Sequence, residues 1–285
     1  MRDTARGRLL CKPVSPRASV GYVQRMNFWC EIDGERAVTV NVSSRDELLH
    51  DLEARLRNGR GFAVATLNLD HVVKLRRDPA FGAAYLGQTH VTADGNPIIW
   101  LLRLAGRKVE LVTGSDLVDP TAALAARLGV PVAMLGSTAE SLEAAKSELV
   151  RRHDGLKTVA AIAPPMGFDP EGPEADAALA RIAAGGARLC FLALGAPKQE
   201  ILAARGRRLY PDIGFLSIGA GLDFVSGSQR RAPPVFRRLA VEWLWRLASD
   251  PRRLAGRYMA CAGSLPGLAV TALRTRGDTP GKVDA

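Results

Sequence analysis

LCFLALGAPKQE, residues 189–200, and IGFLSIGAGLDF, residues 213–224, decide the fold of this 285-residue chain. Each stretch begins with a short apolar run, which is typical of a strand buried on both faces. Each run ends at a glycine, and a helix-forming segment follows. Such strand-turn-helix units favour an open α/β sheet with parallel strands, in which ligands bind where the strands end. We therefore expect a site around Lys198–Glu200 and Gly219–Gly221.

The same alternation of strands and helices runs through the rest of the chain. Strands are expected at residues 62–67, 90–93, 109–113, 130–135, 159–163, 189–194 and 213–218, with helices between them. A small β hairpin around Asp33-Gly34 comes before the first of these strands. The predicted fold class is α/β, with a Rossmann-like, mostly parallel sheet flanked by helices and a helical, basic C-terminal appendage.

Composition is ordinary for a globular protein except for its charge. Apolar residues make up 47% of the chain and charged residues 24%. The net charge is +10, and eight arginines lie between Arg230 and Arg257 against only Glu242 and Asp250. A local basic excess favours polyanionic partners, which are nucleic acids, anionic membranes or phosphorylated substrates.

Cysteine spacing and hydropathy exclude several classes of protein. The cysteines at positions 11, 30, 190 and 261 follow no metal-binding spacing, which argues against a metal site and for a reducing cytosol. The first 22 residues lack the continuous apolar segment of a secretory signal. The uncharged run at 258–273 is interrupted by glycine and proline and is shorter than the roughly 18 to 20 residues of a spanning helix.

Polar residues at the predicted strand ends are the first candidates for chemistry. Thr66 and Asn68 lie two positions apart, so they face the same side of an extended segment. Asn68 also suits the N-cap of the next helix. Asp94 follows the strand at 90–93, where a carboxylate can act as a general base or can simply stabilise the turn at Gly95. From the residues alone, both interpretations stay open.

Two glycine turns are candidate ligand sites. Gly136 precedes Ser137 and Thr138, either of which can cap a helix whose first backbone amides suit a phosphate. Glu140 in the first turn of that helix favours a capped helix without a ligand. Gly219 permits a close approach of the backbone to a ligand, or serves only a tight turn.

Eight motifs occur in a fixed order along the chain. They are T-x-N at 66–68, A-D-G at 93–95, V-T-G-S-D-L at 112–117, G-x-P-K-Q-E at 195–200, G-x-G-x-D-F at 219–224, R-A-P at 231–233, E-W-L-x-R-L at 242–247, and P-x-R through R-Y at 251–258. This series resembles the WecG/TagA/CpsF family of bacterial glycosyltransferases, over about residues 27 to 258.

The resemblance implies an activity, a substrate class and partners. It implies an inverting, metal-independent glycosyltransferase, without a cofactor, that acts in the synthesis of a cell-surface polysaccharide. The donor is a UDP-sugar carrying N-acetylmannosamine, its uronic acid or a hexose. The acceptor is a saccharide linked to polyprenyl diphosphate.

By the same resemblance, Asp94 is the catalytic base that deprotonates the acceptor hydroxyl, and no residue binds a metal. Gln199 positions the donor, and Asp223 contacts its nucleotide. The full set of predicted substrate-binding residues is Thr66, Asn68, Gln199, Asp223, Gly136, Gly219, Arg231 and Arg237.

One position departs from the family pattern. Many members read Glu-Arg-Val-Thr-Gly where this chain has ELVTG at 110–114, so Leu111 replaces an arginine usually credited with a diphosphate contact. Another cation must then stabilise the leaving diphosphate. We expect Arg231 and Arg237 to do so, and the alternatives are a different donor or a loss of activity.

We expect three segments: a mobile tail at 1–26, the α/β glycosyltransferase core at 27–229, and a basic amphipathic membrane-docking appendage and tail at 230–285. In the appendage, Trp243 and Trp245 are interfacial aromatics on a basic helix. The alternative is an ordinary helix packed on the core with a solvated basic face. The expected location is cytoplasmic and peripheral, on the inner face of the cell membrane, with the anionic membrane surface as a partner. A homo-oligomer stays open.

Two other classes of protein fit less of the sequence. A dinucleotide-dependent oxidoreductase needs G-x-G-x-x-G after the first strand of the core, and this pattern is missing there. A nucleic-acid-binding protein fits the charge, but the chain has no helix-turn-helix pattern or aromatic RNA-binding motif. We therefore expect no nucleic-acid partner.

Overall fold

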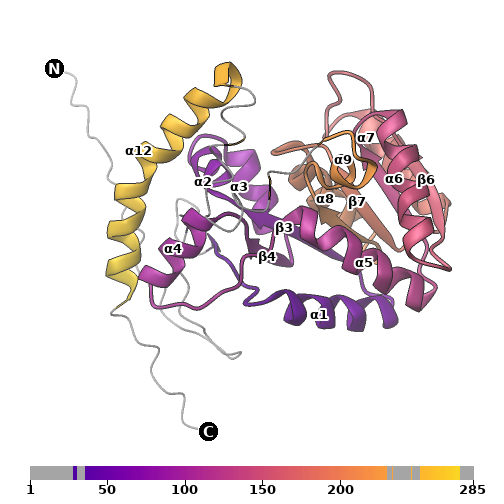
Figure 1. The fold of residues 1–285 in the computed structure, drawn as a ribbon, viewed down its shortest axis with the longest axis horizontal. Coiled ribbons are helices and arrows are strands. Elements are labelled where there is room, and N and C mark those ends of the chain that lie inside the picture. The colour runs from indigo at the N-terminus through magenta and orange to yellow at the C-terminus, as the bar shows by residue number, and fades with distance from the viewer. Residues whose placement is uncertain (1–27, 31–35, 230–232, 234–244, 246–250, 277–285) are drawn as a thin grey trace, which may run out of the picture.

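The computed structural model describes residues 28–30, 36–229, 233, 245 and 251–276 (Figure 1). The predicted tail at 1–26 lies outside these residues. So do Arg231, Arg237 and nearly all of the predicted basic helix around Trp243.

The centre of the fold is a six-stranded sheet in which every pair of neighbours is parallel. Its strands are β3 (Phe62–Leu67), β4 (His90–Ala93), β5 (Val132–Gly136), β6 (Thr158–Ile162), β7 (Leu189–Ala193) and β8 (Gly214–Ser217). They are arranged in the order β4-β3-β8-β7-β5-β6. The prediction of a Rossmann-like parallel sheet is confirmed.

The predicted strand at 109–113 is wrong. The segment forms only a single parallel bridge between Leu111 and Ala93, with Val112 N donating to Ala93 O at 2.9 Å. Of its apolar residues, Val112 is buried in the core, Val109 is partly buried, and Leu111 is exposed. The Thr92 hydroxyl of β4 also donates to Val112 O, and this bond helps to hold the segment against the end of β4.

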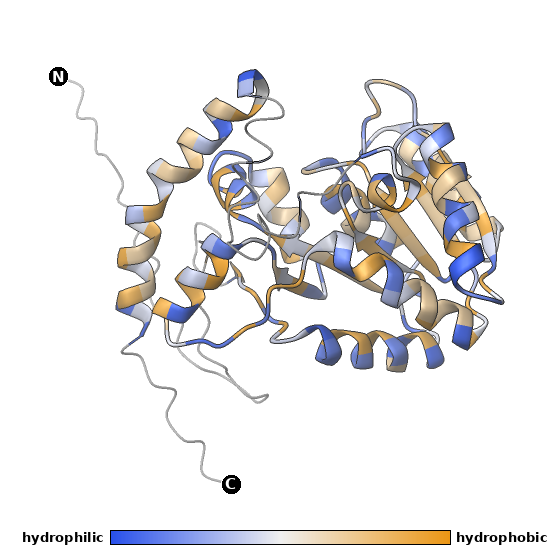
Figure 2. Ribbon diagram, viewed as in Figure 1, coloured by the Kyte–Doolittle hydropathy of each residue, from blue (hydrophilic) through white to orange (hydrophobic). Residues whose placement is uncertain are grey.

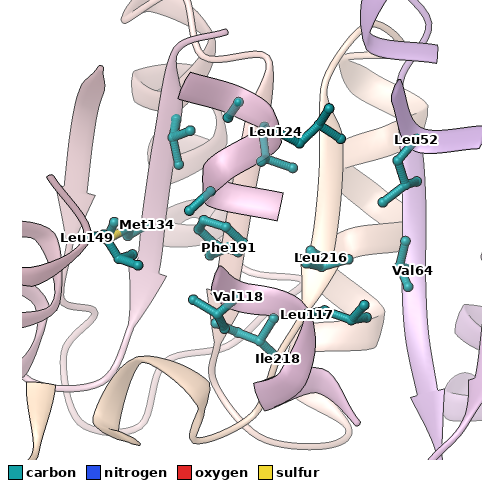
Figure 3. Close-up of a cluster of buried hydrophobic side chains, with 14 of the residues drawn as sticks. Leu52, Val64, Leu117, Val118, Leu124, Met134, Leu149, Phe191, Leu216 and Ile218 are labelled. Atoms are coloured by element: carbon teal, nitrogen blue, oxygen red, sulfur yellow. The ribbon is translucent and has the colours of Figure 1, made fainter. Parts of the chain in front are cut away.

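One face of the sheet is covered by α1 (Arg45–Arg57), α5 (Gly114–Leu128), α6 (Ala139–Arg152) and the short α9 (Gly221–Ser226). Figure 3 shows the core on this side, where Phe191 and Met134 of the sheet meet Val118 of α5 and Leu149 of α6. The helices are capped as their sequences predict, since the side chains of Ser44 and Thr138 accept backbone N–H groups at the starts of α1 and α6.

The opposite face is covered by α2 (Leu69–Leu75), α3 (Pro79–Leu86), α4 (Asn96–Leu104), α7 (Pro173–Ala184) and α8 (Lys198–Leu209). The strands alternate between the two faces. Val64 packs on the α1 side, whereas Ala63 packs with α7 and α8, and Ala65 packs with α2 and α3. The complete burial of β3 and β7 follows from this double cover, whereas the edge strand β6 is partly exposed.

A two-stranded antiparallel hairpin pairs β1 (Trp29–Cys30) with β2 (Ala37–Val38). The predicted small β element is therefore present, while its turn at Asp33-Gly34 lies outside the described residues. Phe28 and Val38 are buried in the cluster that α2, α3 and α4 share.

The C-terminal helix α12 (Pro251–Thr275) packs against α2 and α4 at the edge of the molecule (Figure 1). It runs through Gly263, Pro266 and Gly267 without a break. Cys261, Leu268 and Ala272 of α12 are buried in the cluster shared with α2 and α4. Among the described residues, no helix meets the length and hydropathy needed to cross a membrane. A domain boundary at residue 230 stays a prediction.

Leu268→Ala tests how α12 is held. Leu268 is 1% exposed, so we expect a loss of about 2 to 5 kcal/mol in the free energy of unfolding, measured by urea denaturation. The matched control is Val270→Ala on the exposed face of the same helix, which should cost less than about 0.5 kcal/mol. Equal losses for the two variants would show that α12 does not depend on this contact.

Candidate functional site

The carboxyl ends of β3 and β4 meet at one edge of the sheet. Thr66 lies beside Thr92 and Leu67 beside Ala93 in the parallel register. Asp94 N donates to Leu67 O at 2.8 Å, so the backbone of Asp94 is fixed next to the end of β3. The turn that follows depends on Gly95, whose φ of 95° favours glycine. Asp94 itself is half-buried at this edge.

Asn68 and Thr66 hold the same edge from the β3 side. Asn68 caps α2, its Oδ1 accepting from His71 N at 3.0 Å. The prediction that Asn68 caps the next helix is thus confirmed for its side-chain oxygen. The two N–H donors on its Nδ2 are not used by this cap. Thr66 is 4% exposed, and its carbonyl accepts from the Tyr85 hydroxyl at 3.4 Å. Asp94, Thr66 and Asn68 therefore lie at the ends of adjacent strands.

The ends of β7 and β8 are joined by a buried amide. Gln199, at the start of α8, is 3% exposed, and its Oε1 accepts from Gly219 N at 3.0 Å. Gly219 has a φ of 56°, and a Cβ at this position would meet nothing within 4 Å. The turn after β8 is therefore open on its outer side. Because β8 pairs directly with β3, this turn lies about 10 Å from the end of β4.

Gly136 and Asp223 have structural partners at the end of β5. A Cβ on Gly136 would lie 2.3 Å from the carbonyl oxygen of Ala193, and its φ is 124°, so packing against β7 alone requires glycine. The Asp223 carboxylate accepts from the hydroxyls of Ser137 and Ser141 and, at 3.0 Å, from Gln229. These three bonds leave Asp223 one of its roughly four acceptor positions.

Leu111 lies where the family pattern places an arginine. It pairs with Ala93, one residue before Asp94, and it is 39% exposed. The side chain at this position is therefore close to Asp94 and the ends of β3 and β4, and in this chain it carries no charge. Arg231 and Arg237, the predicted replacements, lie outside the described residues.

A comparison with the models of known protein families matches residues 36–279 to the glycosyl transferase WecG/TagA/CpsF family. The chain belongs to this family. Membership makes it a glycosyltransferase of the class that acts in cell-surface polysaccharide synthesis. The match extends beyond the residues on which the resemblance rests and includes all of α12. The C-terminal helix is thus part of what the WecG/TagA/CpsF family shares.

Sequence reasoning missed a buried polar group behind the edge of this WecG/TagA/CpsF protein. The Tyr85 hydroxyl lies 2.7 Å from His71 Nδ1 and is fully enclosed. Burial lowers the pKa of His71 to about 3, so its imidazole is neutral. Burial, and then the negative charges of Glu200 and Asp94, raise the pKa of Tyr85, which keeps its proton. Fourteen residues separate His71 from Tyr85, and no local pattern links them.

Glu200 lies in the segment where the sequence predicts a site, but its complete burial was not predicted. It has no exposed surface, and its Oε1 accepts from Gln199 Nε2 at 2.8 Å. Burial raises the pKa of Glu200 to about 7, against the hydrogen bond from Gln199 and the charge of Lys74, which lower it. The sequence signal for this burial is the apolar pair Ile201 and Leu202 directly after Glu200. A carboxylate is rarely buried unless it is paired, so a buried Glu200 points to a specific partner.

An ion-pair cluster ties α12 to the site. The Asp70 carboxylate of α2 lies 2.8 Å from the Lys74 ammonium and 3.0 Å from Arg257 Nε of α12. The same ammonium donates to Ala196 O, in the turn after β7, at 3.2 Å. On the other side of that turn, Lys198 Nζ donates to Phe168 O at 2.7 Å and fixes the loop after β6. Among the described residues, no cluster of His, Cys, Asp and Glu could hold a metal ion.

Glu200→Gln should change how stability depends on pH. The folded protein keeps the Glu200 proton up to about pH 7, while the unfolded chain loses it near 4.5, so stability falls as pH rises through this window. For Glu200→Gln this fall is absent, and the variant should gain about 3 kcal/mol relative to wild type between pH 4.5 and 7.5. Urea denaturation at several pH values measures it.

Glu143→Gln is the control, because its side chain is exposed on α6. Its difference from wild type should not vary with pH. A Glu200→Gln difference that is equally flat would show that the buried carboxyl is already ionised at pH 4.5.

Proposed function

We propose that this protein transfers a sugar from a UDP-sugar donor to a saccharide linked to polyprenyl diphosphate, with inversion and without an obligatory metal. The observation that carries the proposal is the juxtaposition of Asp94 with Asn68 and the open Gly219 turn on one sheet edge. Family membership supports glycosyl transfer. The donor sugar is N-acetylmannosamine, its uronic acid or a hexose.

In the proposed mechanism, Asp94 acts as the general base. Its carboxylate takes the proton of the acceptor hydroxyl, whose oxygen then bonds to the anomeric carbon of the donor. The bond from that carbon to the diphosphate breaks, and UDP leaves with the electron pair from the opposite face, which inverts the configuration. Such a step needs one carboxylate near the hydroxyl and donors near the departing oxygens.

We assign the donor to the ends of β3 and β8. The Nδ2 group of Asn68, which has no partner among the described residues, is a donor toward the sugar or diphosphate. The outer side of Gly219 offers the nucleotide a close approach to the backbone. The single free acceptor position of Asp223 is available for a ribose hydroxyl. Gln199 positions the donor through Gly219, because its amide oxygen is already bonded to that residue.

The charge of the leaving diphosphate needs a cation that Leu111 does not supply. We keep Arg231 and Arg237 in this role, as residues of the region between α9 and α12. Arg257 and Lys74 are bound to Asp70, so they hold the structure around the site instead.

We also propose that α4 and α12 form a membrane-docking surface, defined by the exposed side chains of Trp100, Leu104, Met259, Val270 and Leu273. The two helices carry Arg103, Arg252, Arg253, Arg257 and Arg274, and neither contains an acidic residue. Figure 2 shows hydrophobic residues over much of α12, in contrast to the largely hydrophilic α1. Apolar contact with nearby arginines is the pattern that binds anionic bilayers peripherally.

Asp94→Asn tests the chemistry. The protein is incubated with a panel of UDP-hexoses and UDP-N-acetylhexosamines, together with short polyprenyl-diphosphate saccharides, and products are identified by mass. Loss of the base should lower the transfer rate by about 10² to 10⁴-fold while UDP affinity is kept. Asp176→Asn, on α7, should transfer at the wild-type rate. Full activity of Asp94→Asn would remove Asp94 from the mechanism.

Liposome binding by matched variants tests the proposed membrane-docking surface. In liposome flotation, binding should require anionic lipid, weaken with salt, and fall several-fold for Trp100→Gln with Leu104→Gln, since each contributes apolar contact. Val150→Gln on α6 is the control, because Val150 is 44% exposed, close to the 49% of Trp100, yet lies on the other side of the sheet. Equal flotation of all variants would place the membrane contact elsewhere.

A further inference from the structure

Two buried side chains at the start of α8, Gln199 and Glu200, form a chain of hydrogen bonds that ends on the turn after β8. Gln199 Oε1 accepts from Gly219 N at 3.0 Å, and Gln199 Nε2 donates to Glu200 Oε1 at 2.8 Å. Both side chains are enclosed by the protein. The second carboxyl oxygen of Glu200 is also buried, with no hydrogen-bond partner in the part of the chain that the structure describes.

This chain of bonds fixes the direction of an amide that has two orientations. Gly219 N–H is a donor, so only the oxygen of the Gln199 amide can satisfy it. The Gln199 NH₂ group must then face Glu200, which accepts from it. With the amide reversed, two donors would meet at Gly219 and two acceptors at Glu200, and both buried pairs would be lost. Glu200 therefore selects the orientation that holds Gly219.

We propose that Glu200 is a positioning residue for the donor site, acting through Gln199 to hold the Gly219 turn in the conformation that receives the nucleotide. The role in donor binding rests on the function proposed above, whereas the coupling of Glu200 to Gly219 does not. Glu200 touches no substrate, since it lies behind Gln199 with no exposed surface.

The charge state of Glu200 matters for this role. A carboxylate accepts a hydrogen bond about twice as strong as a neutral carboxyl does. The charged and titratable groups facing Glu200 are Lys74 of α2 and the neutral Tyr85 of α3, whose hydroxyl contacts the neutral His71. Ser217 of β8, on the α8 side of the sheet, is uncharged. Because the pKa of Glu200 is about 7, its ionised form increases as pH rises through neutrality.

The first experiment is steady-state kinetics of Glu200→Leu and Glu200→Gln with the donor established for the wild type. Glu200→Leu removes the acceptor, and kcat/KM for the donor should fall by about tenfold or more, chiefly through KM. Glu200→Gln retains an acceptor oxygen, and it should stay within about threefold of wild type at pH 7. We expect wild-type kcat/KM to rise as pH increases through 7, because the Glu200 carboxylate forms there, and we expect no such rise in Glu200→Gln.

The second experiment measures hydrogen exchange of the Gly219 amide by NMR, without any substrate. Glu200→Leu should lower the protection of this amide by about tenfold or more, while Glu200→Gln preserves it. Gln88→Leu is the matched control, because Gln88 Nε2 donates to the backbone oxygen of Glu200 and not to its carboxyl. The control should keep wild-type protection at Gly219.

A double variant separates positioning from general packing. If Glu200 acts through Gln199, then Glu200→Leu should have little further effect on donor KM once Gln199→Leu is present. Additive effects, or wild-type Gly219 exchange in Glu200→Leu, would overturn the proposal. If the wild type transfers no sugar, the proposed function fails, and the exchange measurement alone still decides whether Glu200 holds the turn.

Discussion

β3 forms hydrogen bonds with β4 on one side and β8 on the other, and both strands run parallel to it. The site depends on this arrangement. The carboxyl ends of parallel strands lie at the same edge of the sheet, so residues that are far apart in the sequence become neighbours in space. Asp94 follows β4, Asn68 follows β3 and Gly219 follows β8, with β3 between the other two. The candidate site edge is therefore a consequence of strand order, and the loops supply its polar side chains.

Behind this edge, polar groups are buried and bonded to one another. Gln199, Glu200, His71 and Tyr85 form two short chains of hydrogen bonds that end on backbone groups at the sheet, Gly219 N and Thr66 O. Burying such groups costs stability unless they are paired, and the pairing in turn fixes the backbone atoms at the ends of the chains. Rigid backbone at this place suits the proposed transfer, in which the charge of the leaving group must be met by preorganised donors.

The C-terminal helix joins the same system from outside. Arg257 of α12 and Lys74 of α2 share the Asp70 carboxylate, and Lys74 continues to the carbonyl of Ala196 beside α8. The exposed apolar side chains of α12 and α4 lie on adjacent helices, and α4 begins two residues after Asp94. If these helices contact a bilayer, the proposed base Asp94 lies next to the start of one of the contacting helices. This position suits an acceptor that is held in the membrane.

The sequence by itself determined the α/β class, the positions of most strands and helices, a helix cap at Ser137 or Thr138, and the family, because these depend on local periodicity and on motif order. It also placed Asp94, Asn68 and Gln199 at strand ends. It failed at residues 109–113, where the apolar pattern reflects burial of Val112 and not a strand.

Only the tertiary structure decided which of these ends are neighbours, that Gly136 is needed for packing on Ala193, and that Asp223 is held by Ser137, Ser141 and Gln229. It alone brought Glu200 behind Gly219 and Arg257 to Asp70. The reason is physical. Propensity, capping and hydropathy act over a few residues. The contacts of Gly219 with Gln199, of Gly136 with Ala193, of Asp223 with the two serines, and of Asp70 with Arg257 join residues 20 to 187 positions apart, which come together only when the whole core is packed.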